Sequence, residues 1–125
     1  MGEQSGDSVN PTAFSVGKQQ VDHAVVLTVS GEVDMLSSPQ LAEAIQTALA
    51  AKPTALIVDL SKVDFLASAG MTVLVTAHAE VAPPTRFAIV ANGAATARPI
   101  KLMGIDSVLS LYSTLDRALS AIADG

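Results

Sequence analysis

The stretch ALIVDLSKVDFLASAGM, residues 55–71, decides the fold of this chain. Its first six residues are almost continuously apolar, which is typical of a β-strand covered on both faces. From Met71 onward, apolar residues recur instead at helical spacing. The sequence therefore predicts a central strand over residues 55–60, a short loop, and a helix over residues 68–81 that begins at the small hydroxyl of Ser68.

The same two periodicities predict alternating strands and helices in the rest of the chain. The segment Ser37-Ser38-Pro39 is a typical helix start, since a hydroxyl can cap the first turn and proline fits there. The other predicted elements are strands at 14–21, 23–30, 87–91 and 108–112, and helices between 37 and 53, at 95–103 and at 114–123. An opening hairpin followed by this order indicates an α/β fold, with a mostly parallel or mixed sheet of about five strands and four helices.

The composition limits the chain to a few classes of protein. At 125 residues it is long enough for one domain with a core and too short for two of ordinary size. Its net charge of −5 has the wrong sign for neutralising nucleic-acid phosphates or an anionic membrane surface. The absence of cysteine excludes disulfides, thiolate nucleophiles and Cys-based zinc sites. We therefore expect a single domain that binds no nucleic acid.

The N-terminal end of the sequence differs in character from the rest. Residues 1–12 are polar and rich in Gly and Ser, without the basic flank and apolar run of a signal peptide. We expect them to form a flexible leader, and residues 13–125 to form the single domain. The longest apolar-looking stretch, residues 65–82, is interrupted by polar residues and indicates a buried helix rather than a membrane span. A cytoplasmic protein without direct membrane insertion is therefore expected.

Ser68 admits two interpretations from its position alone. A serine at the start of a helix can accept a hydrogen bond from an unpaired backbone N–H and stabilise the helix by about 1 kcal/mol, which is the commoner use. A phosphate on the same hydroxyl would lie at the positive end of the helix dipole, where an anion is favoured. The small neighbours Ala67, Ala69 and Gly70 would leave the hydroxyl open to an approaching protein. Both interpretations remain open at this point.

The sequence around Ser68 does not predict catalysis. His23 lies at a predicted strand start, and His78 lies on the apolar face of the predicted helix, where a core or interface histidine is expected. The Ala-Ser-Ala-Gly context of Ser68 lacks the Gly-x-Ser-x-Gly turn of hydrolases. Two isolated histidines do not make a metal site, and a Gly-rich phosphate loop is missing. We therefore expect a protein that is not an enzyme, needs no cofactor or metal, and carries Ser68 as a substrate.

Asp34 follows a predicted strand in the sequence Gly-Glu-Val-Asp. A carboxylate at such a place commonly holds a turn or caps a helix. If the strand before Asp34 and the central strand are parallel neighbours, however, Asp34 and Ser68 lie at the same rim of the sheet, where ligands of open α/β sheets gather. Asp59 and Asp64 are expected to be solvated acids in a loop or at a strand end.

Four segments together resemble the STAS domain, and specifically the small stand-alone anti-sigma factor antagonists of bacteria. They are GEVD at 31–34, DLSKVDFLASAGM at 59–71, LMGI at 102–105 and TLDRAL at 114–119. The second segment is the most specific, and its wording is more similar to actinobacterial members than to the Bacillus type. The resemblance covers nearly the whole chain after the leader and implies a STAS-like fold.

The resemblance also implies a function. In such proteins the serine that matches Ser68 is phosphorylated by the anti-sigma factor, a serine kinase of the histidine-kinase-like fold, and a serine phosphatase removes the phosphate. The unphosphorylated antagonist binds the anti-sigma factor and frees a sigma factor, which regulates transcription. Asp34 matches a family residue at the partner interface, and the partner-binding surface is implied to include Ser68, Ala69, Gly70 and Met71.

Ala67 and Ala69 stand where Bacillus-type members carry Asp and Ser on either side of the phosphorylated serine. Without the neighbouring acid, a phosphate on Ser68 would meet less repulsion. Two further hypotheses are an accessory subunit of a membrane transporter and a STAS adaptor that signals without phosphorylation. We expect a monomer or a weak dimer that pairs through the edge of the opening hairpin.

Overall fold

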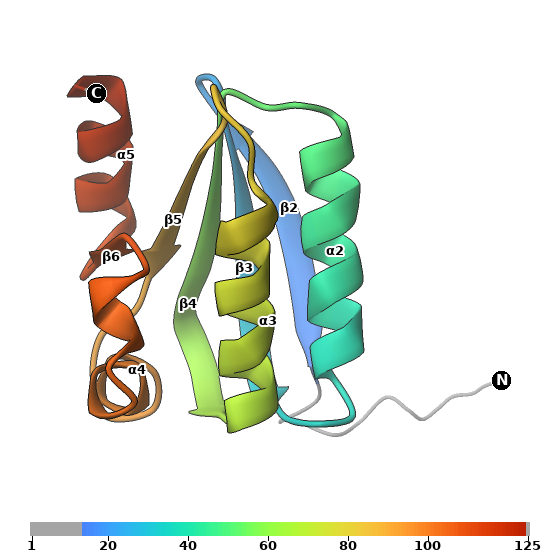
Figure 1. The fold of residues 1–125 in the computed structure, drawn as a ribbon, viewed down its shortest axis with the longest axis vertical. Coiled ribbons are helices and arrows are strands. Elements are labelled where there is room, and N and C mark those ends of the chain that lie inside the picture. The colour runs from blue at the N-terminus through green and yellow to red at the C-terminus, as the bar shows by residue number, and fades with distance from the viewer. Residues whose placement is uncertain (1–13, 125) are drawn as a thin grey trace, which may run out of the picture.

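The computed structural model describes residues 14–124, which form a five-stranded sheet with helices on both faces (Figure 1). In sheet order, the strands are β2 (Ser15–Val21), β3 (Ala24–Val33), β4 (Ala55–Leu66), β5 (Arg86–Val90) and β6 (Leu111–Tyr112). The helices are α2 (Ser38–Ala50), α3 (Ser68–Glu80), α4 (Ala97–Leu102) and α5 (Leu115–Asp124), with a 3₁₀ turn, η1 (Ile105–Ser107), before β6.

The sheet is mixed, because β2 and β3 pair antiparallel while all the other neighbouring strands pair parallel. The predicted α/β class, the opening hairpin and the alternation of later strands with helices are confirmed. The predicted leader, residues 1–12, lies outside the described residues.

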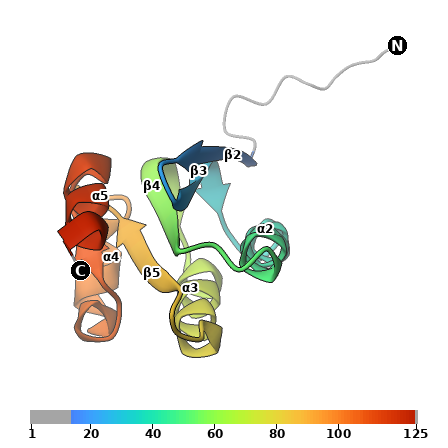
Figure 2. The same ribbon diagram turned by 90° about the horizontal axis from the view of Figure 1, so that it is seen from above.

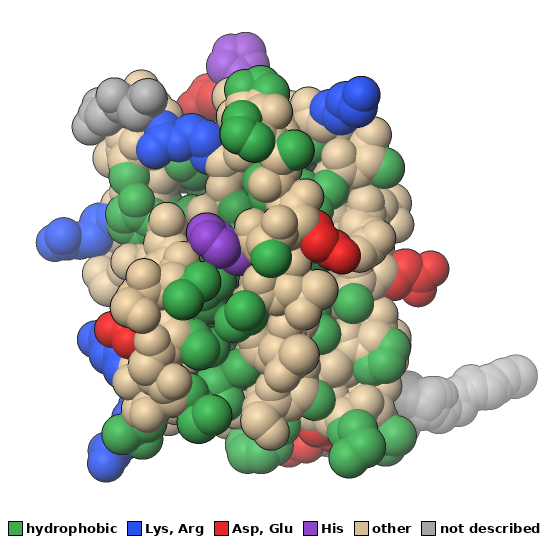
Figure 3. Space-filling model, in the orientation of Figure 1, with side chains coloured by type: hydrophobic (Ala, Val, Ile, Leu, Met, Phe, Trp, Pro, Cys, Tyr) green, Lys and Arg blue, Asp and Glu red, His purple; other side chains and the backbone are tan. Residues whose placement is uncertain are grey.

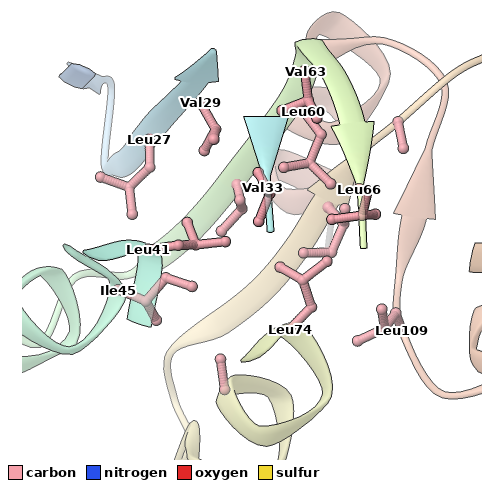
Figure 4. Close-up of a cluster of buried hydrophobic side chains, with 14 of the residues drawn as sticks. Leu27, Val29, Val33, Leu41, Ile45, Leu60, Val63, Leu66, Leu74 and Leu109 are labelled. Carbon is pink, nitrogen blue, oxygen red and sulfur yellow. The ribbon is translucent and has the colours of Figure 1, made fainter. Parts of the chain in front are cut away.

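Alternate residues of each strand face opposite sides of the sheet, and each side has its own core. On the larger side, Leu41 and Ile45 of α2 and Leu74 of α3 point toward Leu27 and other buried strand side chains (Figure 4). On the smaller side, α5 packs against strand residues such as Val26. Figure 2 shows α3 and α5 on opposite sides of β5. This two-sided burial explains why the central strands read as continuous apolar runs.

β4 is longer than the sequence predicted. The predicted strand covered residues 55–60, whereas β4 continues to Leu66 and pairs with β3 up to Val33. Irregular register in this pairing lets Val63 and Leu66 reach the core. The exposed neighbours Ser61 and Lys62 break the simple alternation of a strand, and for this reason the prediction of a loop was wrong.

Two smaller predictions are wrong for related reasons. Asp59 is buried rather than solvated, because β4 continues past it, and its carboxylate accepts the N–H of Ser61 at 2.9 Å. The predicted strand at 108–112 shortens to Leu111–Tyr112, because η1 precedes it and Leu109 turns into the core. Neither difference changes the order of the elements or the end of the sheet at which Ser68 lies.

Candidate functional site

Ser68 is the first residue of α3, and its side chain is exposed where β4 gives way to the helix. The cap residue is Ala67, with extended backbone (φ −81°, ψ 166°), and within the described chain this helix start has no side-chain capping bond. Of the two interpretations of Ser68, the one in which it caps α3 is therefore wrong. The capping position lies one residue earlier, which leaves the serine hydroxyl at the surface of the first turn.

Two close contacts fix the start of α3 on the sheet. The N–H of Ala67 donates to the carbonyl of Val33, the last residue of β3, at 2.8 Å. A Cβ added to Gly70 would lie 2.5 Å from Cγ1 of Val33 and 2.8 Å from Cδ1 of Leu66, so glycine is required for this approach. Met71, the next residue, is also buried. These contacts set the position of the exposed first turn.

The structure brings the five predicted partner-binding residues together, but in two layers. Ser68 is exposed, and Ala69 and Asp34 are half-buried, so these three reach the surface. Gly70 and Met71 are buried beneath them and can act on a partner only through the position of the other three.

Asp34 holds the turn between β3 and α2. Its Oδ1 accepts the N–H groups of Leu36 at 2.9 Å and of Ser37 at 3.0 Å. The hydroxyl of Ser37 accepts the N–H of Asp34 at 2.9 Å and donates to the carbonyl of Glu32 at 2.8 Å. The bond from the N–H of Ser37 is the main cause that lowers the pKa of Asp34, while desolvation opposes it. Asp34 is thus a turn carboxylate that also lies at the rim shared with Ser68.

Five large hydrophobic side chains are exposed around this end of the sheet, and we name them the apolar rim. They are Met35 (77% exposed), Leu36 (86%), Phe65 (51%), Leu102 (75%) and Met103 (62%). Figure 3 shows hydrophobic side chains along the lower edge of the molecule, the edge at which α3 begins in Figure 1. Apolar side chains that gather on a surface mark interaction sites, whereas scattered ones do not. The sequence analysis missed this set.

A shallow groove of about 540 Å³ lies beside two side chains of the apolar rim. Phe65 at the end of β4 and Leu102 of α4 line it. The start of α3 lies between this groove and the turn that carries Met35 and Leu36 (Figure 1). Ser68 therefore has apolar surface on two sides, an arrangement that suits contact with another protein.

His78, the other residue with possible chemistry on α3, lies far from Ser68. It is ten residues further along the helix, roughly 15 Å away. Its ring lies 6.4 Å from that of Phe87, and its buried Nδ1 has no hydrogen-bond partner in the described chain. Residues 14–124 contain no group of three His, Asp or Glu side chains suited to a metal ion. In the same residues, every helix is too short or too polar to span a membrane.

Comparison with known proteins places the chain in a family. The STAS domain matches residues 15–118. The anti-sigma-F factor antagonist RsfB of Mycobacterium tuberculosis is 38% identical over 115 residues, which are 92% of this chain and 94% of RsfB. The crystal structure of an anti-sigma factor antagonist from Mycobacterium paratuberculosis superposes with a TM-score of 0.87 at 41% identity, covering 91% of this chain and 97% of that one.

A more distant structure extends the likeness in fold. The anti-sigma factor antagonist SpoIIAA in its unphosphorylated form has a TM-score of 0.69 at 19% identity, covering 90% of this chain and 98% of its own. The resemblance predicted from the four sequence segments is confirmed, and the chain belongs to the STAS domain family.

Proposed function

We propose that this protein is a non-enzymatic anti-sigma factor antagonist. It binds an anti-sigma factor through the apolar rim together with Asp34, Ser68 and Ala69, and the sigma factor is released. Gly70 and Met71 support this surface from beneath. The anti-sigma factor, a serine kinase of the histidine-kinase-like fold, phosphorylates Ser68 and thereby ends binding, and a serine phosphatase restores it.

The observation that carries this proposal is the exposed hydroxyl of Ser68, which is free of a capping role. A serine that stabilised the helix start could not be modified without a cost to the fold. Ser68 can be modified at no such cost, and it lies among exposed hydrophobic side chains. In a chain 38% identical to an anti-sigma-F factor antagonist, this is where a covalent switch would act on a partner.

The start of α3 suits a phosphate group. The first N–H groups of a helix lack partners within the helix, and the dipole is positive at that end. Phosphorylation adds about −1.5 to −2 charges and three acceptor oxygens. Ala67 and Ala69 add no charge beside Ser68. The phosphorylated protein is therefore expected to stay folded, so that the modification changes the surface alone.

Phosphorylation of Ser68 would oppose binding through desolvation. Ser68 lies between the two parts of the apolar rim, so a partner that covers the rim would also remove water from a phosphate on Ser68. Removing that water is costly unless the charge is paired. A penalty of only about 1.4 kcal/mol already lowers the affinity tenfold. The switch therefore needs no change of backbone conformation.

The direct test is phosphate transfer. The purified protein is incubated with Mg-ATP and candidate anti-sigma factors from the same genome, and its intact mass is measured. We expect one phosphate on the wild type and none on Ser68→Ala. The variant Ser120→Ala, which removes an exposed serine of α5, should still take one phosphate. Without ATP, Ser68→Ala should bind the anti-sigma factor like the wild type.

Binding to the same anti-sigma factors and co-purification from cells, measured beside the intact mass, distinguish the alternatives. Stable binding without phosphate transfer would support a STAS adaptor that works without phosphorylation and contradict the switch. Absence of binding to every anti-sigma factor, together with co-purification of a membrane transporter, would support an accessory transport subunit. The proposal further assigns the protein to the cytoplasm, with residues 13–125 as one domain that is a monomer or a weak dimer.

A further inference from the structure

The turn between β3 and α2 keeps its polar groups inside and its apolar side chains outside. Ser37 and Ser38 are buried, although both are hydroxyl residues. Met35 and Leu36, which precede them, are the most exposed large hydrophobic side chains among residues 14–124. We name these two residues the hydrophobic tip.

Hydrogen bonds hold the backbone of the hydrophobic tip from both sides. Oδ1 of Asp34 accepts the N–H of Leu36, which belongs to the tip itself. The N–H of Ser38 donates to the carbonyl of Asp34 at 2.8 Å, and the hydroxyl of Ser38 donates to the same oxygen. On the other side, the hydroxyl of Ser37 links the N–H of Asp34 to β3 through the carbonyl of Glu32. The tip cannot fold back over the core without breaking these bonds.

From this geometry we infer that Met35 and Leu36 insert into an apolar recess of the anti-sigma factor, and that Asp34 is a positioning residue that acts through them. The inference rests on the proposed function and specifies what the partner must offer. Covering exposed apolar side chains of this size with another protein surface is favourable and contributes to the free energy of binding. A turn that is already ordered loses little conformational entropy on binding, so little of this favourable contribution is offset.

The position of the hydrophobic tip favours the anti-sigma factor as its occupant. Val33 ends β3, and its carbonyl accepts the N–H of Ala67. Asp34 and Ser68 follow directly on these two bonded residues, so the tip and the phosphorylation site belong to one continuous surface. A protein that contacts Ser68 must also approach Met35 and Leu36.

A direct role and a positioning role of Asp34 predict different behaviour of its variants. If the carboxylate paired with a cation of the partner, Asp34→Asn and Asp34→Ala would both lose the contact. If the carboxylate holds the tip, Asp34→Asn keeps an Oδ1 acceptor for the N–H groups of Leu36 and Ser37, whereas Asp34→Ala does not. Rescue by asparagine therefore separates the two roles.

The experiment measures binding to the anti-sigma factor by isothermal titration calorimetry without ATP. Met35→Ser combined with Leu36→Ser should weaken binding on the order of 100-fold, because two apolar anchors are lost. Asp34→Ala should weaken it about tenfold, and Asp34→Asn by less than about threefold. Val108→Ser, which removes an exposed apolar side chain after η1, is the matched control and should bind like the wild type.

Amide NMR signals and thermal unfolding complete the test. In Asp34→Asn, the amide signals of Leu36 and Ser37 should stay close to their wild-type positions, and in Asp34→Ala they should move. All variants should unfold cooperatively, because the tip contributes little to the core. Equal weakening by both Asp34 variants, with the tip signals of Asp34→Asn unchanged, would show a direct contact of the carboxylate and overturn the inference.

Three further outcomes would also overturn it. Wild-type affinity of the Met35→Ser, Leu36→Ser variant would exclude the tip as an anchor, and a wild-type dimer that this variant abolishes would assign the tip to a second copy of the chain. A wild-type protein that binds no anti-sigma factor at all would overturn the proposed function together with this inference. The first two outcomes leave the proposed function standing, so the failures are distinguishable.

Discussion

The two ends of the sheet are finished in opposite ways. At the end where β3 and β4 finish, Ser68 and the apolar rim are left exposed. At the other end, where α2 and α3 finish, side-chain hydrogen bonds join separate elements, and we name it the closed end. The amide of Gln46 donates to the carboxylate of Glu80 at 3.0 Å, and the hydroxyl of Thr85 donates to the carbonyl of Pro53 at 2.6 Å.

The second helix layer is tied in at the same closed end. The guanidinium of Arg86, at the start of β5, donates to the carbonyl of Ile122 in α5 at 3.1 Å. Side chains at one end of the molecule thus join its separate elements, whereas the other end leaves large apolar side chains exposed. Stability and recognition are largely separated in space, and Gly70 is where they meet, because it seats the exposed start of α3 on the core.

Gly70→Ala should produce the largest effect, because Gly70 lies both against the core and beneath the exposed start of α3. The new Cβ would crowd Val33 and Leu66, and overpacking of this kind costs about 1–3 kcal/mol in free energy of unfolding. Urea denaturation measures the loss. Gly17→Ala is the control, since its Cβ would meet its nearest neighbour, the carbonyl oxygen of Thr28, at 4.0 Å. Unchanged stability of Gly70→Ala would show that the strand side chains give way.

Ser68→Glu should affect recognition and leave stability alone. The added charge at the exposed first turn should weaken binding to the anti-sigma factor at least about tenfold, or about 1.4 kcal/mol. Its free energy of unfolding should stay within about 0.5 kcal/mol of the wild type, as for most surface substitutions. Ser120→Glu adds the same charge on α5 and should bind normally. Equal binding of both variants would refute the switch.

Thr85→Val tests the closed end of the molecule. Losing the hydrogen bond to the carbonyl of Pro53 should lower the free energy of unfolding by about 0.5–1.5 kcal/mol. Binding to the anti-sigma factor should not change. Thr76→Val, at an exposed position of α3, controls for the substitution itself. Weakened binding of Thr85→Val would mean that the closed end also takes part in recognition.

The smallest effect should be that of pH on the stabilisation that Asp34 gives to the turn of the hydrophobic tip. The pKa of Asp34 is lowered from 3.8, chiefly by the bond from the N–H of Ser37, so folding favours its ionised form. Its contribution to stability should therefore be complete above pH 3.8 and disappear as the pH falls through the lower pKa of the folded state. The measurement is the stability difference between wild type and Asp34→Asn in urea, at pH 7 and in this acidic range. Asp64→Asn, an exposed acid near the same rim, is the control. A difference that grew on acidification would contradict the assignment.

The fold could be predicted because its signals are local and agree with one another. Leu41 and Ile45 follow a helical period, and the run 55–60 reads as a doubly covered strand, as the structure confirms. The extension of β4 could not be predicted, because it depends on irregular register against β3, which is a property of two strands and not of one. Pattern rules see a single segment at a time.

The candidate site was predictable to a smaller extent. The shared rim of Asp34 and Ser68 follows from the parallel pairing of β3 with β4. The helix start at Ser68 was predicted, but the capping residue is Ala67, one position earlier, and this reverses the role of the hydroxyl. Met35 and Leu36 were missed because apolar residues are assigned to the core by default. The sequence signal that could have found them is their position between a strand end and a helix start.

The framed turn has a consequence for how such proteins could be diversified. The bonds that shape it come from the carboxylate of Asp34 and the hydroxyls of Ser37 and Ser38, and they reach Met35 and Leu36 only through the backbone. The two side chains can therefore be exchanged without loss of the hydrogen bonds that shape the turn. Related chains in one cell could be kept from cross-talk by exchanging two residues, without redesigning either the core or the start of α3.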